Sequence, residues 1–181
     1  MERSVTLIAI FAALIAALGL LPNLMLASGV PITAQSLGVM LCGTVLGAKR
    51  GGLAALLFIA LVAVGLPLLP GGRGGLGVFA GPTVGFLLGW PVAAFVTGFL
   101  MERMQRLPVA LAGGVASVIG GIVVLYILGI AGIMAVLDKG PAESFAAMMW
   151  FIPGDVIKAV LAGLITAGLF RARPASVLSR A

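Results

Sequence analysis

The 181-residue chain contains no histidine, a single cysteine and few charges, since only 9% of its residues are Asp, Glu, Lys or Arg. Without histidine it lacks the commonest metal ligand and general base, which argues against hydrolytic chemistry. One cysteine, Cys42, cannot form a disulfide framework or a metal cluster within one chain. It lies in an apolar run and is expected to be a small buried hydrophobe. These absences disfavour an enzyme and predict no catalytic residues, metal site or bound cofactor.

What the chain has instead is hydrophobic sequence. Hydrophobic residues make up 62% of it and the mean hydropathy is +1.28, whereas a soluble domain carries charge on roughly a quarter of its residues. The sequence therefore predicts an integral membrane protein with a single transmembrane domain over residues 1–181. The pI near 10.8 could suggest nucleic acid, but the basic residues sit in small groups at the ends of apolar segments. We expect contact with the lipid bilayer and none with nucleic acid.

Six segments are apolar and helix-length, some of them marginally, because a helix needs about 20 apolar residues to cross roughly 30 Å of hydrocarbon. They predict an all-α fold with six transmembrane helices at about 5–21, 33–48, 51–67, 82–101, 108–135 and 145–170. The apolar run of the first segment exceeds the usual about 7–15 residues of a signal peptide, so we expect it to persist as a mature helix.

Basic residues mark four places that fall on one side of a six-span bundle. These are the amino terminus, the 2–3 loop, the 4–5 loop and the carboxyl tail, with Arg3, Lys49, Arg50, Arg103, Arg106, Arg171, Arg173 and Arg180. By the positive-inside rule both termini are expected to be cytoplasmic.

The sixth segment carries an acid and a base three residues apart, Asp155 and Lys158. On a helix they share one face, and charges within a span are usually functional or paired. A helix that begins near Pro153 would place Asp155 only a few ångströms below the outer end, where a snorkelling ion pair is the plain alternative. The functional interpretation is that Asp155 accepts hydrogen bonds from a ligand and Lys158 supplies a donor.

Two more polar groups are expected on the outer side. Five glycines between Gly71 and Gly77 surround Arg73, in a loop whose backbone can approach a ligand closely or merely connect two helices. Thr33 and Gln35 open the second segment, either as a capping threonine and an exposed glutamine or as ligand contacts. Convergent polar groups at the mouth of an apolar cavity favour a small-molecule binding site over catalysis.

Small residues recur at helical spacing. Gly85 and Gly89 continue a four-residue series, and similar ridges occur in other segments, which favours tight packing of helices. The first segment carries two overlapping pairs of alanines, Ala12, Ala13, Ala16 and Ala17. They predict either internal packing or a face for docking a partner.

Three stretches carry a resemblance to a known family: 31-PITAQSLGV-39, 65-GLPLLPGGRGGLGVFAGPTVGF-86 and 153-PGDVIKAVLA-162. They resemble the BioY family, the biotin-specific S components of energy-coupling factor transporters. The resemblance implies a six-helix S-component fold in a prokaryotic cytoplasmic (inner) membrane, with an outward vitamin site capped by the 1–2 loop. It also implies a transmembrane T subunit and two ATPases of the ABC type as partners, and no Walker motif is found in this chain.

The same resemblance assigns site residues. The acid and lysine of the family's G-D-x-x-K motif fall on Asp155 and Lys158, and the ligand-facing set also takes in Thr33, Gln35, Arg73, Gly74, Gly75, Gly77, Thr83 and Phe86. Asp155 would accept from the ureido nitrogens of biotin, Lys158 or Gln35 would donate to its carbonyl, and Arg73 is the candidate for the valerate carboxylate. The family commonly has a tyrosine where this chain has Phe86, so a hydroxyl contact is absent there. The four alanines would contact the T subunit.

Other functions stay open at this point. The nearest is an S component for another small vitamin, and a small intramembrane enzyme is disfavoured by the missing histidine. A pore-forming or structural membrane oligomer is a further alternative, and the sequence leaves a homo-oligomer open.

Overall fold

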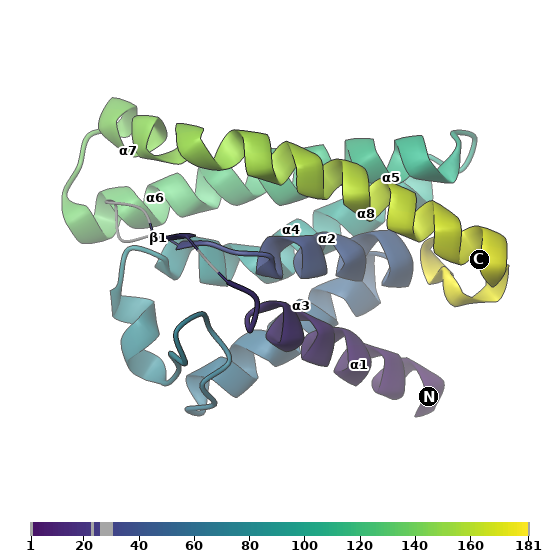
Figure 1. The fold of residues 1–181 in the computed structure, drawn as a ribbon, viewed down its shortest axis with the longest axis horizontal. Helices are drawn as coiled ribbons and strands as arrows, with labels where there is room; N and C mark the ends of the chain where they lie inside the picture. The colour runs from purple at the N-terminus through teal and green to yellow at the C-terminus, as the bar shows by residue number, and fades with distance from the viewer. Residues whose placement is uncertain (1, 23, 26–30, 181) are drawn as a thin grey trace.

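The apolar runs of the sequence fold as helices. The computed structural model describes residues 2–22, 24–25 and 31–180. Its first half contains α1 (Glu2–Leu18), α2 (Gln35–Leu46), α3 (Ala48–Ala63) and α4 (Val84–Arg103), with a short 3₁₀ helix, η1 (Leu76–Ala80), before α4. A two-residue ribbon joins α1 to α2, because β1 (Leu24–Met25) pairs antiparallel with β2 (Pro31–Ile32). The elements lie side by side in an elongated bundle (Figure 1).

Two long helical stretches make up the second half. The first runs through α5 (Val109–Val118), a π-helix η2 (Ile119–Val124) and α6 (Leu125–Leu137), and its 29 residues span about 44 Å at 1.5 Å per residue. The second runs through α7 (Pro141–Met148), η3 (Met149–Phe151) and α8 (Ile152–Ala172). Short 3₁₀ turns, η4 (Pro174–Ser176) and η5 (Leu178–Arg180), complete the tail.

The helix that carries Asp155 begins where the sequence predicted. α8 begins at Ile152, with Pro153 and Asp155 in its first turn, and α7 and η3 extend the helical stretch back to Pro141. Asp155 is therefore close to the start of α8, but it is not at the outer end of the stretch, because α7 and η3 precede it. The expected span of about 145–170 took in part of α7, and the helical stretch begins four residues earlier and ends two residues later.

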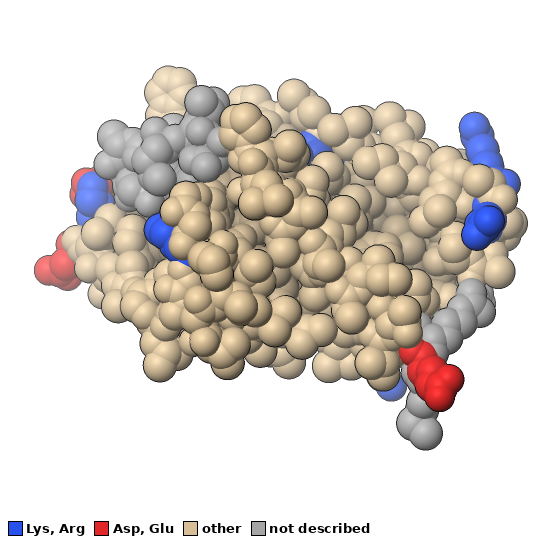
Figure 2. Space-filling model, turned by 60° about the horizontal axis from the view of Figure 1, so that its bottom comes forward, with Lys and Arg blue, Asp and Glu red and all other residues tan. Residues whose placement is uncertain are grey.

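The outer surface is that of a membrane protein. Within the described residues, three helices are long and apolar enough to cross a bilayer, namely Val84–Arg103, Val109–Leu137 and Pro141–Ala172, and α1 to α3 are shorter. Large apolar side chains face outward, for example Ile127 at 63% and Ile157 at 60% exposure. Figure 2 shows charge gathered mostly toward the two ends, with an almost uncharged surface between them. The all-α membrane fold predicted from the sequence is confirmed.

The short helix α2 lies in the centre of the bundle. Ten of its twelve residues are buried, and it packs against α1, α3, α4 and α8. Cys42 within it is fully buried, as its apolar surroundings predicted. The first turn of α2 reaches the candidate site, and its last turn reaches the end of the molecule that holds both termini.

The basic segments gather at one end of the molecule. Arg50 Nε at the start of α3 donates to Ser4 Oγ in α1 (3.2 Å), and the Ala48 amide donates to Glu102 Oε1 at the end of α4 (2.9 Å). The amino and carboxyl termini lie at this same end (Figure 1), as an even number of crossings requires. We call it the basic end.

The carboxyl tail closes the basic end under α2. Val177 and Ser179 are buried; the Ser179 hydroxyl donates to the Thr44 carbonyl oxygen, and Gln105 Nε2 donates to the Ser179 carbonyl oxygen (2.9 Å). Arg180 Nη1 donates to the Gln105 carbonyl oxygen (3.0 Å). The tail therefore ties α2 to the loop after α4.

Glycines set the distances between helices, as their spacing predicted. A Cβ built on Gly85 of α4 would overlap the Leu128 carbonyl oxygen and lie 3.0 Å from the Cα atoms of Gly129 and Gly132 on α6. Such backbone contact is possible only between residues without side chains. The α4–α6 crossing positions side chains of both helices around the candidate site.

Substituting Gly85 with alanine is expected to destabilise the protein by about 1–3 kcal/mol, because the added methyl group forces α4 and α6 apart. The measurement is the thermal unfolding temperature in detergent. Gly168→Ala is the matched control, since a Cβ at Gly168 meets nothing within 4 Å and alanine raises helix propensity. A Gly85→Ala protein as stable as the Gly168→Ala protein would contradict the packing described.

Candidate functional site

A pocket lies at the end of the bundle opposite the basic end. It has an empty volume of about 590 Å³ when the open mouth is included. Its walls come from the first turn of α2, the loop after α3, the first turns of α4 and α6, and the η3–α8 junction. They comprise Thr33, Gln35, Ser36, Leu69, Pro70, Arg73, Thr83, Phe86, Leu87, Trp90, Leu125, Tyr126, Phe151, Asp155 and Lys158.

Asp155 is the centre of a hydrogen-bond network that joins three helices. Its Oδ1 accepts from Lys158 Nζ (2.9 Å) and from Ser36 Oγ of α2 (3.3 Å), and its Oδ2 accepts from Tyr126 OH of α6 (2.7 Å). Lys158 Nζ also donates to Ser36 Oγ (3.0 Å). Three donors therefore fix the carboxylate, and the orientation of α8 against α2 and α6 fixes where it points.

The ion pair is enclosed and does not snorkel. The side chains of Asp155 and Lys158 are 7% and 14% exposed, and both line the pocket. Enclosed charges cost several kcal/mol unless they are paired and hydrogen-bonded. The network meets that requirement, and one donor of the ammonium and one acceptor position of the carboxylate stay unused by it.

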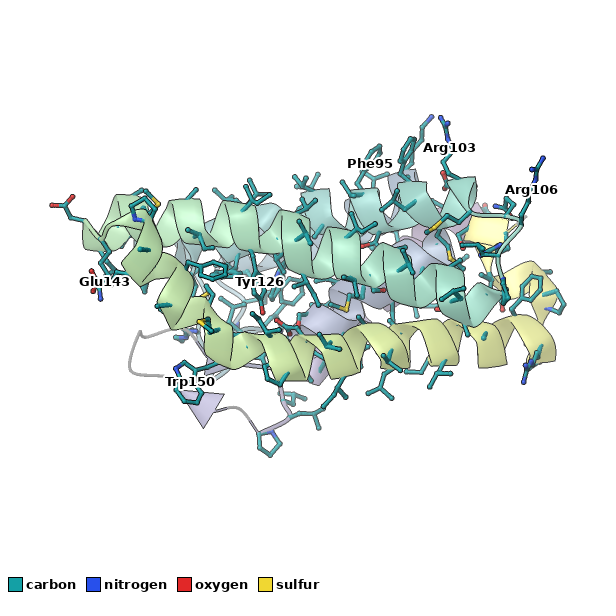
Figure 3. The ribbon with its side chains drawn as sticks, turned by 90° about the horizontal axis from the view of Figure 1, so that it is seen from above. Phe95, Arg103, Arg106, Tyr126, Glu143 and Trp150 are labelled. Carbon is teal, nitrogen blue, oxygen red and sulfur yellow. The ribbon has the colours of Figure 1, made fainter. Side chains whose placement is uncertain are left out.

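Tyr126 is a site residue that the sequence argument missed. It is the only tyrosine of the chain and points into the space between α6 and α8 (Figure 3). The π-helix η2 immediately precedes the α6 turn that carries it, and π segments often occur at functional sites. The one available signal was a lone phenol in an otherwise apolar span. Ser36 was missed too, although it directly follows the predicted Gln35.

Gln35 is fully buried, with its amide oriented by two backbone carbonyls. Its Nε2 donates to the carbonyl oxygens of Ile15 (3.1 Å) and Leu68 (3.0 Å). The nitrogen must take this position, since an oxygen there would face two other oxygens. Its Oε1 has no partner among the described residues. The expectation that Gln35 donates to a ligand is therefore corrected: both amide protons are used, and what it offers the pocket is an acceptor.

The glycine-rich loop holds Arg73 at the pocket, but none of its glycines lines the pocket. Gly71, Gly72 and Gly75 have positive φ, and the Gly75 amide donates to the Val62 carbonyl oxygen of α3 (2.7 Å), which closes the loop onto that helix. Arg73 Nε donates to the Pro70 carbonyl oxygen (3.2 Å). No acidic side chain of the described residues forms an ion pair with Arg73.

Three glycines that were expected at the ligand lie elsewhere. Gly74 packs against the Leu66 backbone, and Gly75 makes the turn just described. Gly77 is exposed, and a Cβ there would meet nothing within 4 Å. The glycines give the loop its shape, and the sequence could not distinguish that role from ligand contact.

Thr33, Thr83 and Phe86 do line the pocket. The Thr33 hydroxyl accepts from the amide of Gln35, the first residue of α2 (3.2 Å). The Phe86 ring meets Tyr126 edge-on, with centroids 6.5 Å apart and planes at 78°. The phenolic hydroxyl of this pocket therefore comes from α6, while position 86 supplies an apolar ring. The part of the 1–2 loop expected to cap the site, residues 26–30, lies outside the described residues.

The alanines of α1 face two ways. Ala12 is 2% exposed and packed in the core, Ala16 is half-buried, and Ala13 and Ala17 are exposed. A docking face that includes Ala12 does not fit this burial; of the four alanines, Ala13 and Ala17 are the two that face outward. No group of three or more His, Cys, Asp or Glu side chains that could hold a metal ion occurs in the described part of the chain.

An apolar helical bundle with a polar pocket near one end is the architecture of an S component. A solved structure described as the S-component for biotin from an ECF-type ABC transporter matches with a TM-score of 0.88 and 30% identity, over 94% of this chain and 92% of that one. The chain belongs to the BioY family, whose family model matches residues 2–175.

Two similar proteins are named biotin transporter BioY. The biotin transporter BioY of Rhodobacter capsulatus is 56% identical over 189 residues, which cover 99% of this chain and 100% of that protein. The biotin transporter BioY of Rhizobium etli is 54% identical over 169 residues, which cover 90% of each chain.

Removing only the acid of the buried pair is expected to destabilise the fold more than removing both charges. Asp155→Asn leaves the Lys158 ammonium enclosed without its carboxylate, at a cost of about 3–5 kcal/mol. Asp155→Asn combined with Lys158→Met removes the stranded charge and should recover most of the loss. The measurement is thermal unfolding in detergent without ligand.

Glu143→Gln is the control for that series. It breaks the Lys139–Glu143 pair, whose side chains are 39% and 61% exposed, and should change stability by less than about 1 kcal/mol. If the double substitution were no more stable than Asp155→Asn alone, the pair would not be enclosed as described.

Proposed function

We propose that the protein is the biotin-capturing S component of an ECF-type transporter. The proposal rests on the hydrogen-bond donors and acceptors of the pocket that have no partner within the protein. Lys158 has one donor not used by the network, Asp155 has one acceptor position, and Gln35 Oε1 is a buried acceptor without a partner.

This set complements a cyclic urea. The ureido ring of biotin has one carbonyl oxygen and two N–H groups, so it needs one donor and two acceptors from the protein. Lys158 would donate to the carbonyl oxygen, and Asp155 and Gln35 would accept from the two nitrogens. A bound urea would satisfy the Gln35 oxygen, whose burial without a partner is otherwise costly.

The rest of the pocket suits the rest of biotin. Leu87, Trp90, Leu125 and Phe151 give an apolar wall for the thiophane ring and the alkyl chain. Arg73, whose Nη atoms form no ion pair in the described residues, would bind the valerate carboxylate through charge-assisted hydrogen bonds. Thr33 and Thr83 are further polar residues that line the pocket.

Membrane placement follows from the two ends of the bundle. The protein is a membrane protein, and the positive-inside rule would put the basic end in the cytoplasm of a prokaryote and the pocket on the outer side of the inner membrane. The ligand would then enter from outside. The six expected segments would be the spans of a single transmembrane domain.

Uptake requires partners that hydrolyse ATP. The matched structure is named as a component of an ABC transporter, so a transmembrane T subunit and two ATPases are the expected partners. Their contact on this chain would be the exposed Ala13 and Ala17 of α1, because small side chains allow close approach of another helix within the membrane. The protein is thus a transport subunit rather than an enzyme.

The test is equilibrium binding of biotin and a panel of other vitamins to the purified protein. Biotin should bind selectively, and the Asp155→Asn, Lys158→Met double variant should bind it roughly 100-fold or more weakly, because a buried charge pair at an interface carries several kcal/mol. Lys139→Gln, at an exposed outer position, should bind like the wild type. Preference for another vitamin, or unchanged binding by the double variant, would refute the proposal.

A further inference from the structure

A second hollow lies at the basic end, on the outer side of the α3–α4 pair. Lys49 and Arg50 from the first turn of α3 and Arg103 from the last turn of α4 surround it, with Phe95, Phe99 and Glu102. Figure 3 shows Phe95 and Arg103 pointing away from the bundle in the same direction. The vitamin pocket shares none of these residues, so the hollow has no role in the function proposed above.

The charge around this hollow is positive. None of the three cations forms an ion pair among the described residues. Arg50 donates to the neutral Ser4 hydroxyl, and Glu102 accepts from the Ala48 amide at the start of α3. One carboxylate against three cations leaves an excess of two positive charges for an anion.

The floor of the hollow is aromatic. Phe95 and Phe99 stack with centroids 6.5 Å apart and planes at 9°, yet they are 45% and 39% exposed. Arg103 Cζ lies 4.7 Å from the centroid of the Phe99 ring, close enough for a cation–π contact. Exposed Leu53 and Leu56 continue the apolar surface along α3.

Polarity changes in a fixed order along α4. Phe99 lies one helical turn and Phe95 two turns farther from the basic end than Arg103, at about 6 Å for each step of four residues. A cationic rim followed by an aromatic and then an aliphatic surface matches the order of phosphate, glycerol and acyl chain in a phospholipid. A soluble phosphate would use the rim but not the rings.

We propose that the hollow binds one anionic phospholipid, with its phosphate between Lys49, Arg50 and Arg103 and an acyl chain along Phe99 and Phe95. With the orientation proposed above, the lipid belongs to the cytoplasmic leaflet, which attracts basic residues at the membrane surface. Arg106 lies at the same end but does not line the hollow (Figure 3), which makes it the matched control.

The experiment is native mass spectrometry of the full chain, purified in a neutral detergent with equal amounts of phosphatidylglycerol and phosphatidylcholine. The wild type should retain one phosphatidylglycerol in preference to phosphatidylcholine. Lys49→Gln combined with Arg103→Gln should lower that preference about 25-fold, at about fivefold for each cation. Arg106→Gln should change it less than about twofold, and all variants should unfold at the wild-type temperature. Excess glycerol phosphate should not displace the lipid.

Several results would overturn the proposal. An equal loss in Arg106→Gln would mean general surface attraction, and displacement by glycerol phosphate would mean a soluble phosphate site. An unchanged preference for phosphatidylglycerol in the double variant would mean that Lys49 and Arg103 do not bind the lipid. Because lipid retention is measured without biotin, it is independent of the vitamin proposal.

Discussion

Asp155 and Lys158 form an ion pair inside a membrane bundle, and enclosing that pair constrains the elements around it. Ser36 of α2 and Tyr126 of α6 each donate to the carboxylate, so three helices must meet at one point. An ammonium and a carboxylate away from water are tolerated only with such partners. The same contacts leave a limited number of free donors and acceptors, and those define what the pocket can recognise.

The packing of the bundle serves this arrangement. Glycine contacts bring α4 and α6 together at Gly85, Gly129 and Gly132, which places Phe86 edge-on against Tyr126. The short α2 puts Gln35 and Ser36 in the pocket, and the carboxyl tail holds its other end through Ser179 and Thr44. The site is thus built on helices and not on the glycine loop, whose contribution is to position Arg73.

Much of the fold and part of the site could be predicted from the sequence. Apolar length gives helices, the basic residues fall at one end as their spacing indicated, and the spacing of Asp155 and Lys158 places them on one face. The partners of that pair could not be predicted, because Tyr126 and Ser36 are distant in the chain and meet it only after folding. The prediction that Gln35 donates to a ligand was wrong for the same reason: the backbone carbonyls of Ile15 and Leu68 accept hydrogen bonds from its side-chain amide.

The central claim is that the pocket offers one donor and two acceptors to a cyclic urea. The most direct measurement compares the affinity of the wild-type protein for biotin with that for 2-iminobiotin, whose cyclic guanidine is protonated at neutral pH. The guanidinium has no acceptor for Lys158 and brings a positive charge toward it, so binding should be weaker by roughly 100-fold or more. Equal affinity for the two compounds would contradict the account.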